Sequence, residues 1–557
     1  MFKLTDPFGT APRKAPFTQS VSTGVPWHNL PVTREYTLGQ LLDQTIARCG
    51  ENDAVVYADR DYRLTWYEFG EEVDRLARGL MALGVRHGEK IALWATNVPH
   101  WVVLMFAAAK IGAILLPLNT NYKEHEMDFA LGQSDAENLF IISGYRDCSY
   151  VDVIYTLVPE LREQPRGELK CEKYPHLKRV MFLGGEKHRG MYSLNEVMAL
   201  AVETPWEDYL KRQAQCDVND VVNMQYTSGT TGFPKGVQLT HRNIGNDGFW
   251  IGACQNLSSR DRVCIPVPLF HCFGCVLGVM SCVNHGATMV FLEKFDPIQV
   301  MMSIEREKCT ATYGVPTMYI AMLDHPLFPK FDFHSLRTGI MSGSACPTHR
   351  MQQVFDRMFM KEVTNPYGLT ESGPVMTMTR YFEPSIERKC QTIGQALPGI
   401  EVAIIDPESG EIAPIGQDGE ICCRGFNTMK GYYKMPEQTA KCIDEKGWLH
   451  SGDIGRMDAD GYYYITGRLK DLIIRGGENI SPKEVEDFLG TMPGVKDVAV
   501  VGCPTRAFDR TVLPLHGCEF VRHPAKARAQ ARAACTSGSS ARRSSGRCPG
   551  SGRISGS

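Results

Sequence analysis

The first part of the chain alternates between two spacings of hydrophobic residues. Leu38, Leu41 and Leu42 recur at the spacing of an amphipathic helix, whereas continuous runs such as 90–94 and 138–142 are typical of buried strands. The predicted elements are a helix from residue 37, a hairpin at 54–65, helices at 66–83, 99–110 and 124–134, and strands at 90–94, 113–118 and 138–142. Because strands alternate with helices, we predict a parallel, doubly wound sheet.

A second α/β run lies between residues 221 and 342. Its predicted strands are 221–225, 237–240, 262–267, 288–292, 311–316 and 336–342, and its predicted helices start at His241, follow Cys272 and span 297–308. From about residue 377 to 466 the pattern changes to short strands with turn residues between them, at 402–406, 419–424 and 461–465. That change predicts a small barrel-like β subdomain.

Four segments are expected along the chain. Residues 1–35 are rich in Pro, Thr and Ser and should be irregular, and residues 36–466 should form one large domain. Residues 467–503 should begin a small C-terminal domain, in which Ser481 and Pro482 are typical of a helix start. The fourth segment is the tail, 504–557.

The composition of the tail differs from that of the rest of the chain. From Val521 onward it has eight Arg and Lys residues and no Asp or Glu. This sequence is rich in Ala, Ser and Gly and has little hydrophobic periodicity. Such a composition predicts disorder. A basic tail can bind nucleic acid or anionic lipid, but GC-rich DNA read out of frame gives similar text. We favour the frame change, between Pro504 and Arg510, so that the small domain is truncated or out of frame.

The overall composition narrows the class of protein. The 557 residues predict two to four structural units, and 43% hydrophobic with 22% charged residues is ordinary for a soluble globular protein. The net charge is −3, so the overall composition lacks the excess of positive charge that is typical of nucleic-acid-binding proteins. The most apolar window, 101–118, contains Lys110 and reads as a buried helix and strand, so at most peripheral membrane association is expected. Nineteen scattered cysteines and no secretory signal favour reduced thiols and a cytoplasmic location.

The stretch 226–236 has the composition of a phosphate-binding loop. It holds four Ser or Thr hydroxyls, three glycines and Lys235 between two strand-like runs. Glycines let backbone N–H groups approach an anion, hydroxyls donate hydrogen bonds and the lysine adds a charge. The spacing differs from that of P-loop NTPases. The alternative is a flexible polar loop.

Other stretches offer complementary groups. Residues 365–372 combine an aromatic ring, glycine, hydroxyl and carboxylate, and Glu371 suits Mg²⁺, which prefers oxygen ligands. Gly343 follows a predicted strand and allows backbone to lie flat against a ring. Asp453, at the end of 448–453, can accept both hydroxyls of a ribose. His271 stands beside aromatic residues, where a lone histidine is more often a core residue.

Taken together, these motifs resemble those of the acyl-adenylate-forming (AMP-binding) enzymes, which include acyl-CoA synthetases, firefly-type luciferases and adenylation domains of peptide synthetases. The resemblance extends over about residues 36–502 and implies a large domain of two doubly wound α/β subdomains and a small β-barrel, followed by a small α+β domain. It implies that the ATP phosphates are held by Thr227, Ser228, Gly229, Thr230, Thr231, Gly232 and Lys235.

The resemblance also assigns the remaining residues. The adenine- and acyl-binding turn would be Gly343, Ser344 and Ala345, while Tyr367 and Gly368 would meet the adenine, Thr370 the α-phosphate and Glu371 the Mg²⁺. Asp453 would bind ribose, Arg468 phosphate or ribose, Lys470 would be the hinge pivot, and Gly476, Gly477 and Glu478 would line the pantetheine tunnel. His271 would gate the acyl pocket. The implied catalytic residues are Thr227, Lys235, His271, Glu371, Arg468 and Lys470.

The implied reaction is the activation of a medium- or long-chain fatty acid with ATP and Mg²⁺, followed by transfer to CoA. No acidic residue stands in 268–274, which favours an uncharged tail over an amino acid. The family's C-terminal Gly-Lys motif is not found after Gly502, so adenylation should be slowed, by an electrostatic contribution of about 3–4 kcal/mol. An acyl-AMP ligase that loads a carrier protein and an inactive nucleotide- or acyl-binding relative remain alternatives. A homodimer is compatible with the sequence.

Overall fold

The computed structural model describes residues 17–26, 30–227, 234–343, 347–469, 473–475, 478–480, 486, 500–503 and 511–513. The chain divides into two compact units. The first comprises residues 1–451 and 456–464, and the second comprises residues 452–455 and 465–557.

An eight-stranded mixed sheet contains most strands of the first α/β run. Its order is β10-β9-β6-β4-β5-β11-β12-β23, parallel from β10 to β11 and antiparallel across the last two pairs. The strands are β4 (Lys90–Trp94), β5 (Ile114–Pro117), β6 (Asn138–Ile141), β9 (Arg179–Phe182), β10 (Tyr192–Ser193), β11 (Val221–Thr227), β12 (Lys235–Thr240) and β23 (Gly431–Tyr432). The predicted parallel sheet is therefore confirmed, with antiparallel strands at one edge.

A seven-stranded sheet contains most strands of the second run. Its order is β17-β16-β15-β13-β14-β2-β3, and only the β2–β3 pair is antiparallel. The strands are β2 (Asp53–Tyr57), β3 (Tyr62–Thr65), β13 (Arg262–Ile265), β14 (Thr288–Phe291), β15 (Ala311–Gly314), β16 (Thr338–Met341) and β17 (Glu362–Thr364). The hairpin predicted at 54–65 thus forms, but it joins this sheet through β14, while β11 and β12 complete the other sheet.

The helices predicted from residue 37, at 66–83, 99–110 and 124–134, from His241 and at 297–308 all form, and the structure adds helices that were not predicted. The helices are α1 (Leu38–Cys49), α2 (Trp66–Ala82), α3 (His100–Lys110), α4 (Glu124–Ser134), α5 (Tyr150–Leu157), α6 (Leu194–Ala199), α7 (Trp206–Ala214), α8 (His241–Cys254), α9 (Ser281–His285), α10 (Pro297–Glu307), α11 (Pro316–Leu323), α12 (Thr348–Arg357), α13 (Ile386–Gln391) and α14 (Pro436–Cys442). Capping boxes at Thr37, Thr65 and Thr240 satisfy backbone N–H groups at three of the helix starts. The helix predicted after Cys272 begins as a π-helix, η3 (Phe273–Met280).

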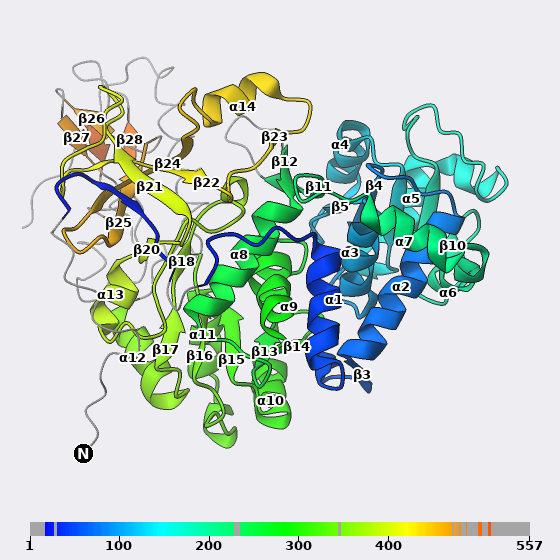
Figure 1. Ribbon diagram of the computed structural model, residues 1–557, viewed down its shortest axis with the longest axis horizontal. Coiled ribbons are helices and arrows are strands. Elements are labelled where there is room, and N and C mark those ends of the chain that lie inside the picture. The colour runs from blue at the N-terminus through cyan, green and yellow to red at the C-terminus, as the bar shows by residue number, and fades with distance from the viewer. Residues whose placement is uncertain are drawn as a thin grey trace, which may run out of the picture. The chain divides into compact units, whose positions relative to one another are not determined.

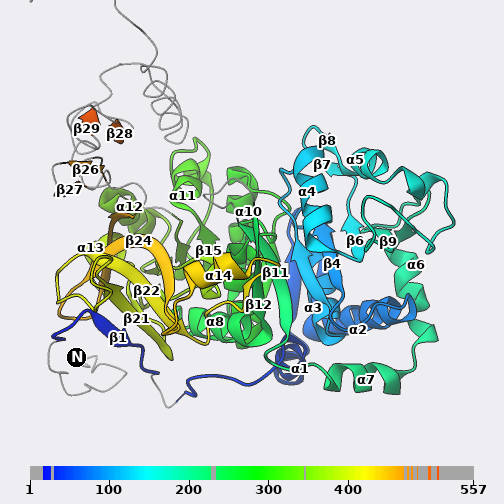
Figure 2. The same cartoon turned by 90° about the horizontal axis from the view of Figure 1, so that it is seen from above.

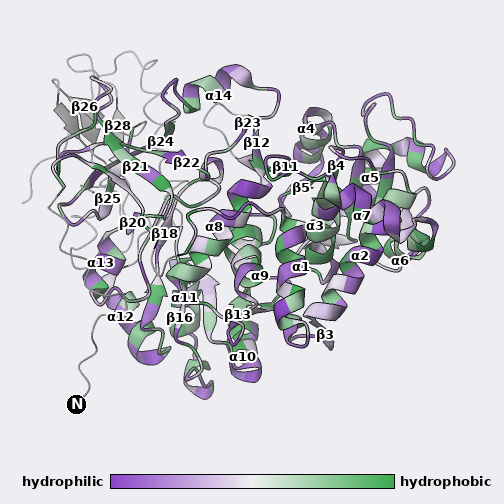
Figure 3. Cartoon of the chain, in the orientation of Figure 1, coloured by the Kyte–Doolittle hydropathy of each residue, from purple (hydrophilic) through white to green (hydrophobic). Residues whose placement is uncertain are grey.

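Helix α1 packs between helices of the two runs. It contacts α3 and α9, and Figure 1 shows it standing between them. Residues 101–110 of α3 are all buried, and the Lys110 ammonium lies 2.6 Å from Asp43 Oδ1 and 2.8 Å from Asp74 Oδ1. Among the described residues, no helix is long and apolar enough to cross a membrane. The apolar window 101–118 forms the buried helix α3 and the strand β5, as predicted. Outer helices such as α7 and α14 carry many hydrophilic residues, which are purple in Figure 3.

The predicted small β subdomain is a five-stranded sheet of order β1-β21-β22-β24-β25. Its strands are β1 (Val21–Thr23), β21 (Ile400–Ile405), β22 (Gly419–Gly425), β24 (Leu449–Met457) and β25 (Tyr463–Arg468). Strand β1 comes from the segment expected to be irregular, and it pairs antiparallel with β21 (Figure 2). That expectation was wrong for residues 21–23, because their pairing partner lies far away in the sequence.

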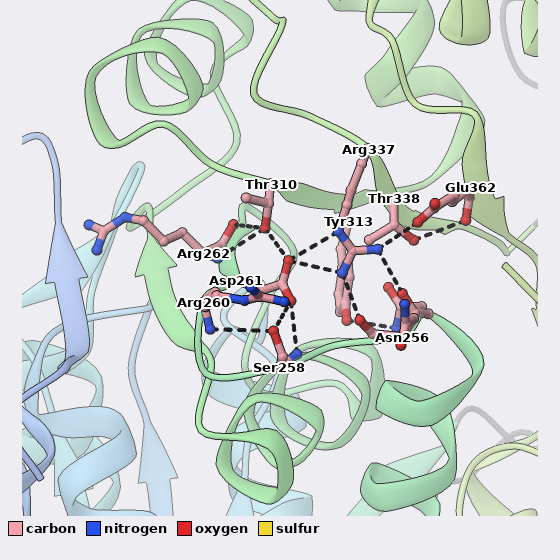
Figure 4. A network of polar contacts seen from close by, with 11 residues as sticks. Asn256, Ser258, Arg260, Asp261, Arg262, Thr310, Tyr313, Arg337, Thr338 and Glu362 are labelled. Atoms are coloured by element: carbon pink, nitrogen blue, oxygen red, sulfur yellow. Dashed lines mark hydrogen bonds and ion pairs between the residues drawn. The ribbon is translucent and has the colours of Figure 1, made fainter. Parts of the chain in front are cut away.

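A polar network joins the amino ends of four neighbouring strands in the seven-stranded sheet. Asp261 Oδ1 accepts hydrogen bonds from Thr310 Oγ1 at 2.8 Å and Arg337 Nη2 at 2.9 Å (Figure 4). Arg337 Nη1 donates to Glu362 Oε2 at 2.6 Å, and the Ser258 N–H donates to Asp261 Oδ2 at 2.8 Å. These charges are paired at one end of the sheet, which leaves its carboxyl end for the candidate site.

The second unit contains two described hairpins. Strand β26 (Ile473–Arg475) pairs with β27 (Glu478–Ile480), and β28 (Val501–Cys503) pairs with β29 (Thr511–Leu513). Strand β29 lies in the tail segment 504–557, before Val521, where the stretch that is predicted to be disordered begins. The helix predicted at Ser481 and the remainder of the tail lie outside the described residues.

Candidate active site

The predicted phosphate-binding stretch connects two strands of a hairpin. Strands β11 and β12 are antiparallel, and Thr227 stands opposite Lys235 at the end of the pairing. Ser228, Gly229, Thr230, Thr231 and Gly232 lie outside the described residues. The two flanking residues are therefore held in register by regular β-sheet hydrogen bonds, which position a hydroxyl beside a cation.

Glu371 faces this hairpin from the short 3₁₀ helix η5 (Thr370–Ser372). Its Oε1 accepts a hydrogen bond from Tyr432 Oη at 2.8 Å and a long one, 3.5 Å, from Thr227 Oγ1. The backbone carbonyl of Glu371 accepts the N–H of Met429 at 2.9 Å. A carboxylate held in this way offers the oxygen donors that suit Mg²⁺.

Tyr432 connects the lysine to the carboxylate. It lies in β23, which pairs with β12, and the Lys235 ammonium is 4.5 Å from the centre of its ring. Burial is the main cause of a raised pKa of the Tyr432 phenol, and the Glu371 carboxylate is the next. The phenol therefore keeps its proton and donates a hydrogen bond to Glu371. Sequence reasoning missed Tyr432, because a two-residue strand gives no periodic signal; only its contacts reveal it.

The His271 segment is attached to the same hairpin by buried polar contacts. Cys272 Sγ donates to Gln225 Oε1 of β11 at 2.8 Å, and Gln225 Nε2 donates to Cys275 Sγ at 3.2 Å. Cys272 Sγ also lies 3.5 Å from Thr370 Oγ1. Burial raises the pKa of the Cys275 thiol to about 12. The two cysteines are therefore neutral packing groups. The fourteen cysteines whose side chains the structure describes form no disulfide.

His271 itself is exposed at the end of this segment. Its Nδ1 accepts the N–H of Phe273 at 3.1 Å. Desolvation by the surrounding protein lowers the pKa of the imidazole, although the residue is exposed. The side chain is therefore a neutral group at neutral pH, available at the carboxyl end of β13.

The predicted adenine-binding residues come from two adjacent turns. Ser342 Oγ donates to the Pro366 carbonyl at 2.7 Å, which ties the turn after β16 to strand β18 (Pro366–Tyr367). Gly343 has φ +95°, which favours glycine. At Gly368 a Cβ would lie 2.1 Å from the Pro374 carbonyl oxygen, so only glycine fits there. Ser344 and Ala345 lie outside the described residues.

Asp453 and Arg468 belong to the second unit and contact each other. Arg468 Nε lies 3.0 Å from Asp453 Oδ1, the carboxylate being buried and the guanidinium exposed. Glu478 lies in β27, described only by its backbone, while Lys470, Gly476 and Gly477 lie outside the described residues. The structure thus brings together Thr227, Lys235, Thr370 and Glu371 in one unit and Asp453 with Arg468 in the other.

The candidate site lies at the ends of strands in an α/β fold and offers hydroxyls, a lysine and a carboxylate. These groups suit a phosphate and its metal ion. The fold and the site together therefore define a class of nucleotide-dependent enzymes. The model of the AMP-binding enzyme family matches residues 42–433. The chain belongs to this family, within the acyl-CoA synthetase and ligase superfamily, as the motifs predicted.

Relatives and solved structures agree with this assignment. The chain is 49% identical over 472 residues to “Putative acyl-CoA synthetase YngI” of Bacillus subtilis, covering 85% of this chain and 86% of that protein. It is 38% identical over 469 residues to “Medium-chain acyl-CoA ligase ACSF2, mitochondrial” of Danio rerio, covering 84% and 77%. A structure of ATP-bound MatB from Rhodopseudomonas palustris aligns with TM-score 0.71 and 26% identity, covering 85% and 87%. The predicted enzyme class, an AMP-forming acyl-CoA ligase, is confirmed.

Proposed function

We propose that this chain joins a medium- or long-chain fatty acid to AMP, with ATP and Mg²⁺, and then transfers the acyl group to CoA. The observation that carries the proposal is the Glu371 carboxylate, held by Tyr432 and Thr227 beside Lys235. Medium chain length is supported by the name of the Danio rerio relative. ATP binding is supported by the family match and by the ATP-bound MatB structure.

Each described residue has a distinct proposed role. Lys235 and the hairpin hold the phosphates that leave as pyrophosphate, and Glu371 supplies oxygen ligands for the metal. Mg²⁺, when bound there, neutralises charge on the phosphates. Tyr367 and Gly343 hold the adenine, and neutral His271 borders the entrance for the acyl chain. In the second unit Asp453 accepts the ribose hydroxyls, and Arg468 binds phosphate or ribose once its contact with Asp453 is exchanged.

The direct test is an assay with ATP, octanoate and CoA that follows pyrophosphate and octanoyl-CoA. We expect both products, and we expect Glu371→Gln to lower the rate of pyrophosphate formation about 100-fold, as for a loss of about 3 kcal/mol. Glu437→Gln, at an exposed glutamate of α14, is the matched control and should leave the rate unchanged. Bound ATP without any pyrophosphate would overturn the proposal, and pyrophosphate without octanoyl-CoA would favour transfer to a carrier protein.

We further propose that adenylation is slow in this chain. Residues after Gly502 contain no Gly-Lys motif to place a cation on the reacting phosphate. Replacing residues 504–557 with the corresponding C-terminal segment of a family member that carries the Gly-Lys motif should raise the rate about 100-fold, for about 3 kcal/mol of electrostatic stabilisation. The same exchange with the lysine of that motif changed to alanine is the control. An unchanged rate in the active exchange would contradict the proposal.

A further inference from the structure

Three potential metal ligands converge between two neighbouring strands of the five-stranded sheet. Glu420 and Cys422 alternate along β22 and so point to the same face, and His450 lies on the adjacent strand β24. His450 Nδ1 is 2.7 Å from Glu420 Oε2 and 3.4 Å from Cys422 Sγ. The three ligand atoms all lie within 4.8 Å of one another.

These contacts compete for one nitrogen. If Nδ1 carries a proton it donates to Glu420, and if it does not it accepts from the Cys422 thiol, so a single protonation state serves only one of the two partners well. Glu420 and Cys422 are both buried. A cation placed between the three atoms would have one oxygen, one sulfur and one nitrogen ligand within reach.

The other nitrogen of His450 faces a fourth group. His450 Nε2 is 3.5 Å from Asp444 Oδ2. Asp444 is itself fixed, because its Oδ1 accepts the N–H groups of Lys446 at 2.9 Å and Trp448 at 2.8 Å. A carboxylate behind the imidazole is the usual partner of a metal-binding histidine, because it orients the ring and increases the basicity of the ligating nitrogen.

We propose that Glu420, Cys422 and His450 form a binding site for one divalent cation of the zinc class. Sulfur, imidazole nitrogen and carboxylate oxygen are the ligands of Zn²⁺, whereas Mg²⁺ takes oxygen ligands, so this site differs in chemistry from Glu371. Three protein ligands leave a fourth position for water. On binding, the Cys422 thiol loses its proton to solvent, and the sulfur–metal bond replaces its contact with Nδ1. The proposal is independent of the proposed acyl-CoA ligase activity.

The test starts from chelator-treated full-length protein and Zn²⁺ alone. Equilibrium dialysis of the wild-type protein should give one tightly bound Zn²⁺. We expect the Kd for Zn²⁺ to be at least tenfold higher in Cys422→Ser and in His450→Gln. Cys423→Ser is the matched control, because the neighbouring thiol points to the other face and contacts Asn427. Asp444→Asn should weaken binding by about tenfold to 100-fold, as expected when the partner behind a ligating histidine is changed.

Two outcomes would overturn the site. One is a wild-type protein that binds no Zn²⁺ tightly, and the other is tight binding that survives in the Cys422→Ser/His450→Gln double variant. Should a variant fail to fold, the wild-type protein alone decides: X-ray absorption of the zinc-loaded form should show one sulfur with nitrogen and oxygen ligands. A shell of nitrogen and oxygen without sulfur contradicts the proposal.

Discussion

At the scale of single residues, the candidate site depends on one shared hydrogen-bond acceptor. Glu371 Oε1 accepts a hydrogen bond from the Tyr432 phenol at 2.8 Å. The ring of the same tyrosine lies against the Lys235 ammonium. A hydrogen bond to a charged group contributes about 1.5–3 kcal/mol. Tyr432 is thus a positioning residue, which acts through the carboxylate and the lysine.

Tyr432→Phe removes the hydroxyl and keeps the ring beside Lys235. We expect kcat/KM for ATP to fall about tenfold, for a loss of about 1.5 kcal/mol, and the Mg²⁺ concentration for half-maximal activity to rise. Steady-state kinetics at varied Mg²⁺ measures both. Tyr433→Phe is the control, because its phenol also donates to a carboxylate, Asp135, at 2.8 Å. Equal effects of the two substitutions would argue against a positioning role.

At the scale of secondary-structure elements, α8 begins on a buried histidine. His241 is the first residue of the helix, it is 1% exposed, and its Nδ1 accepts the N–H of Leu38 at 3.1 Å. Burial lowers the pKa of His241 to about 4. The positive end of the helix dipole also disfavours an imidazolium. The start of α8 therefore joins α1 only while the ring is neutral.

This histidine should make stability depend on pH. Its pKa is lower in the folded than in the unfolded protein, where it is about 6.5, so its contribution is complete above pH 6.5 and is lost as the pH falls toward 4. The free energy of unfolding should drop by about 2 kcal/mol between pH 7 and pH 5 from this group. Urea unfolding at both pH values measures it. His241→Asn should show a smaller drop, and an identical drop in wild type and variant would rule out this assignment.

At the scale of the whole first unit, polar groups are divided between the two ends of the seven-stranded sheet. The amino ends of β13, β15, β16 and β17 are joined by the Asp261–Arg337 network, and the carboxyl ends lead into His271, Gly343 and Tyr367. Ligands of open α/β sheets bind at the carboxyl ends of the strands. The network stabilises the end that has no proposed function.

Asp261→Ala tests the importance of that network for the fold. It leaves Arg337, whose side chain is 31% exposed, without one of its two carboxylate partners, and it removes the acceptor of the Ser258 N–H. Losing such hydrogen bonds to a buried carboxylate costs about 3 kcal/mol. We expect a loss of that size in the free energy of unfolding, measured with urea at pH 7. Asp356→Ala, at an exposed carboxylate of α12, should change it by less than about 0.5 kcal/mol. Similar losses in both variants would mean that the network contributes little.

The sequence by itself determined the local elements and the chemistry of the motifs. These features depend on a few neighbouring positions, so they can be predicted along the chain. Examples are the helix starts at Thr37 and Thr65, the spacing of buried residues and the glycine at position 343. The carboxylate at Glu371 and the cation at Lys235 were recognised in the same way, from composition and motif.

Only the tertiary structure decided which distant segments meet. The hairpin of β2 and β3 joins the sheet of the second run, β1 pairs with β21, and Tyr432 joins Lys235 to Glu371. The same holds for the cluster of Glu420, Cys422 and His450. Strand pairing is selected by burial and hydrogen bonding summed over the whole core, and isolated polar residues carry no periodic signal, so neither can be predicted from local pattern.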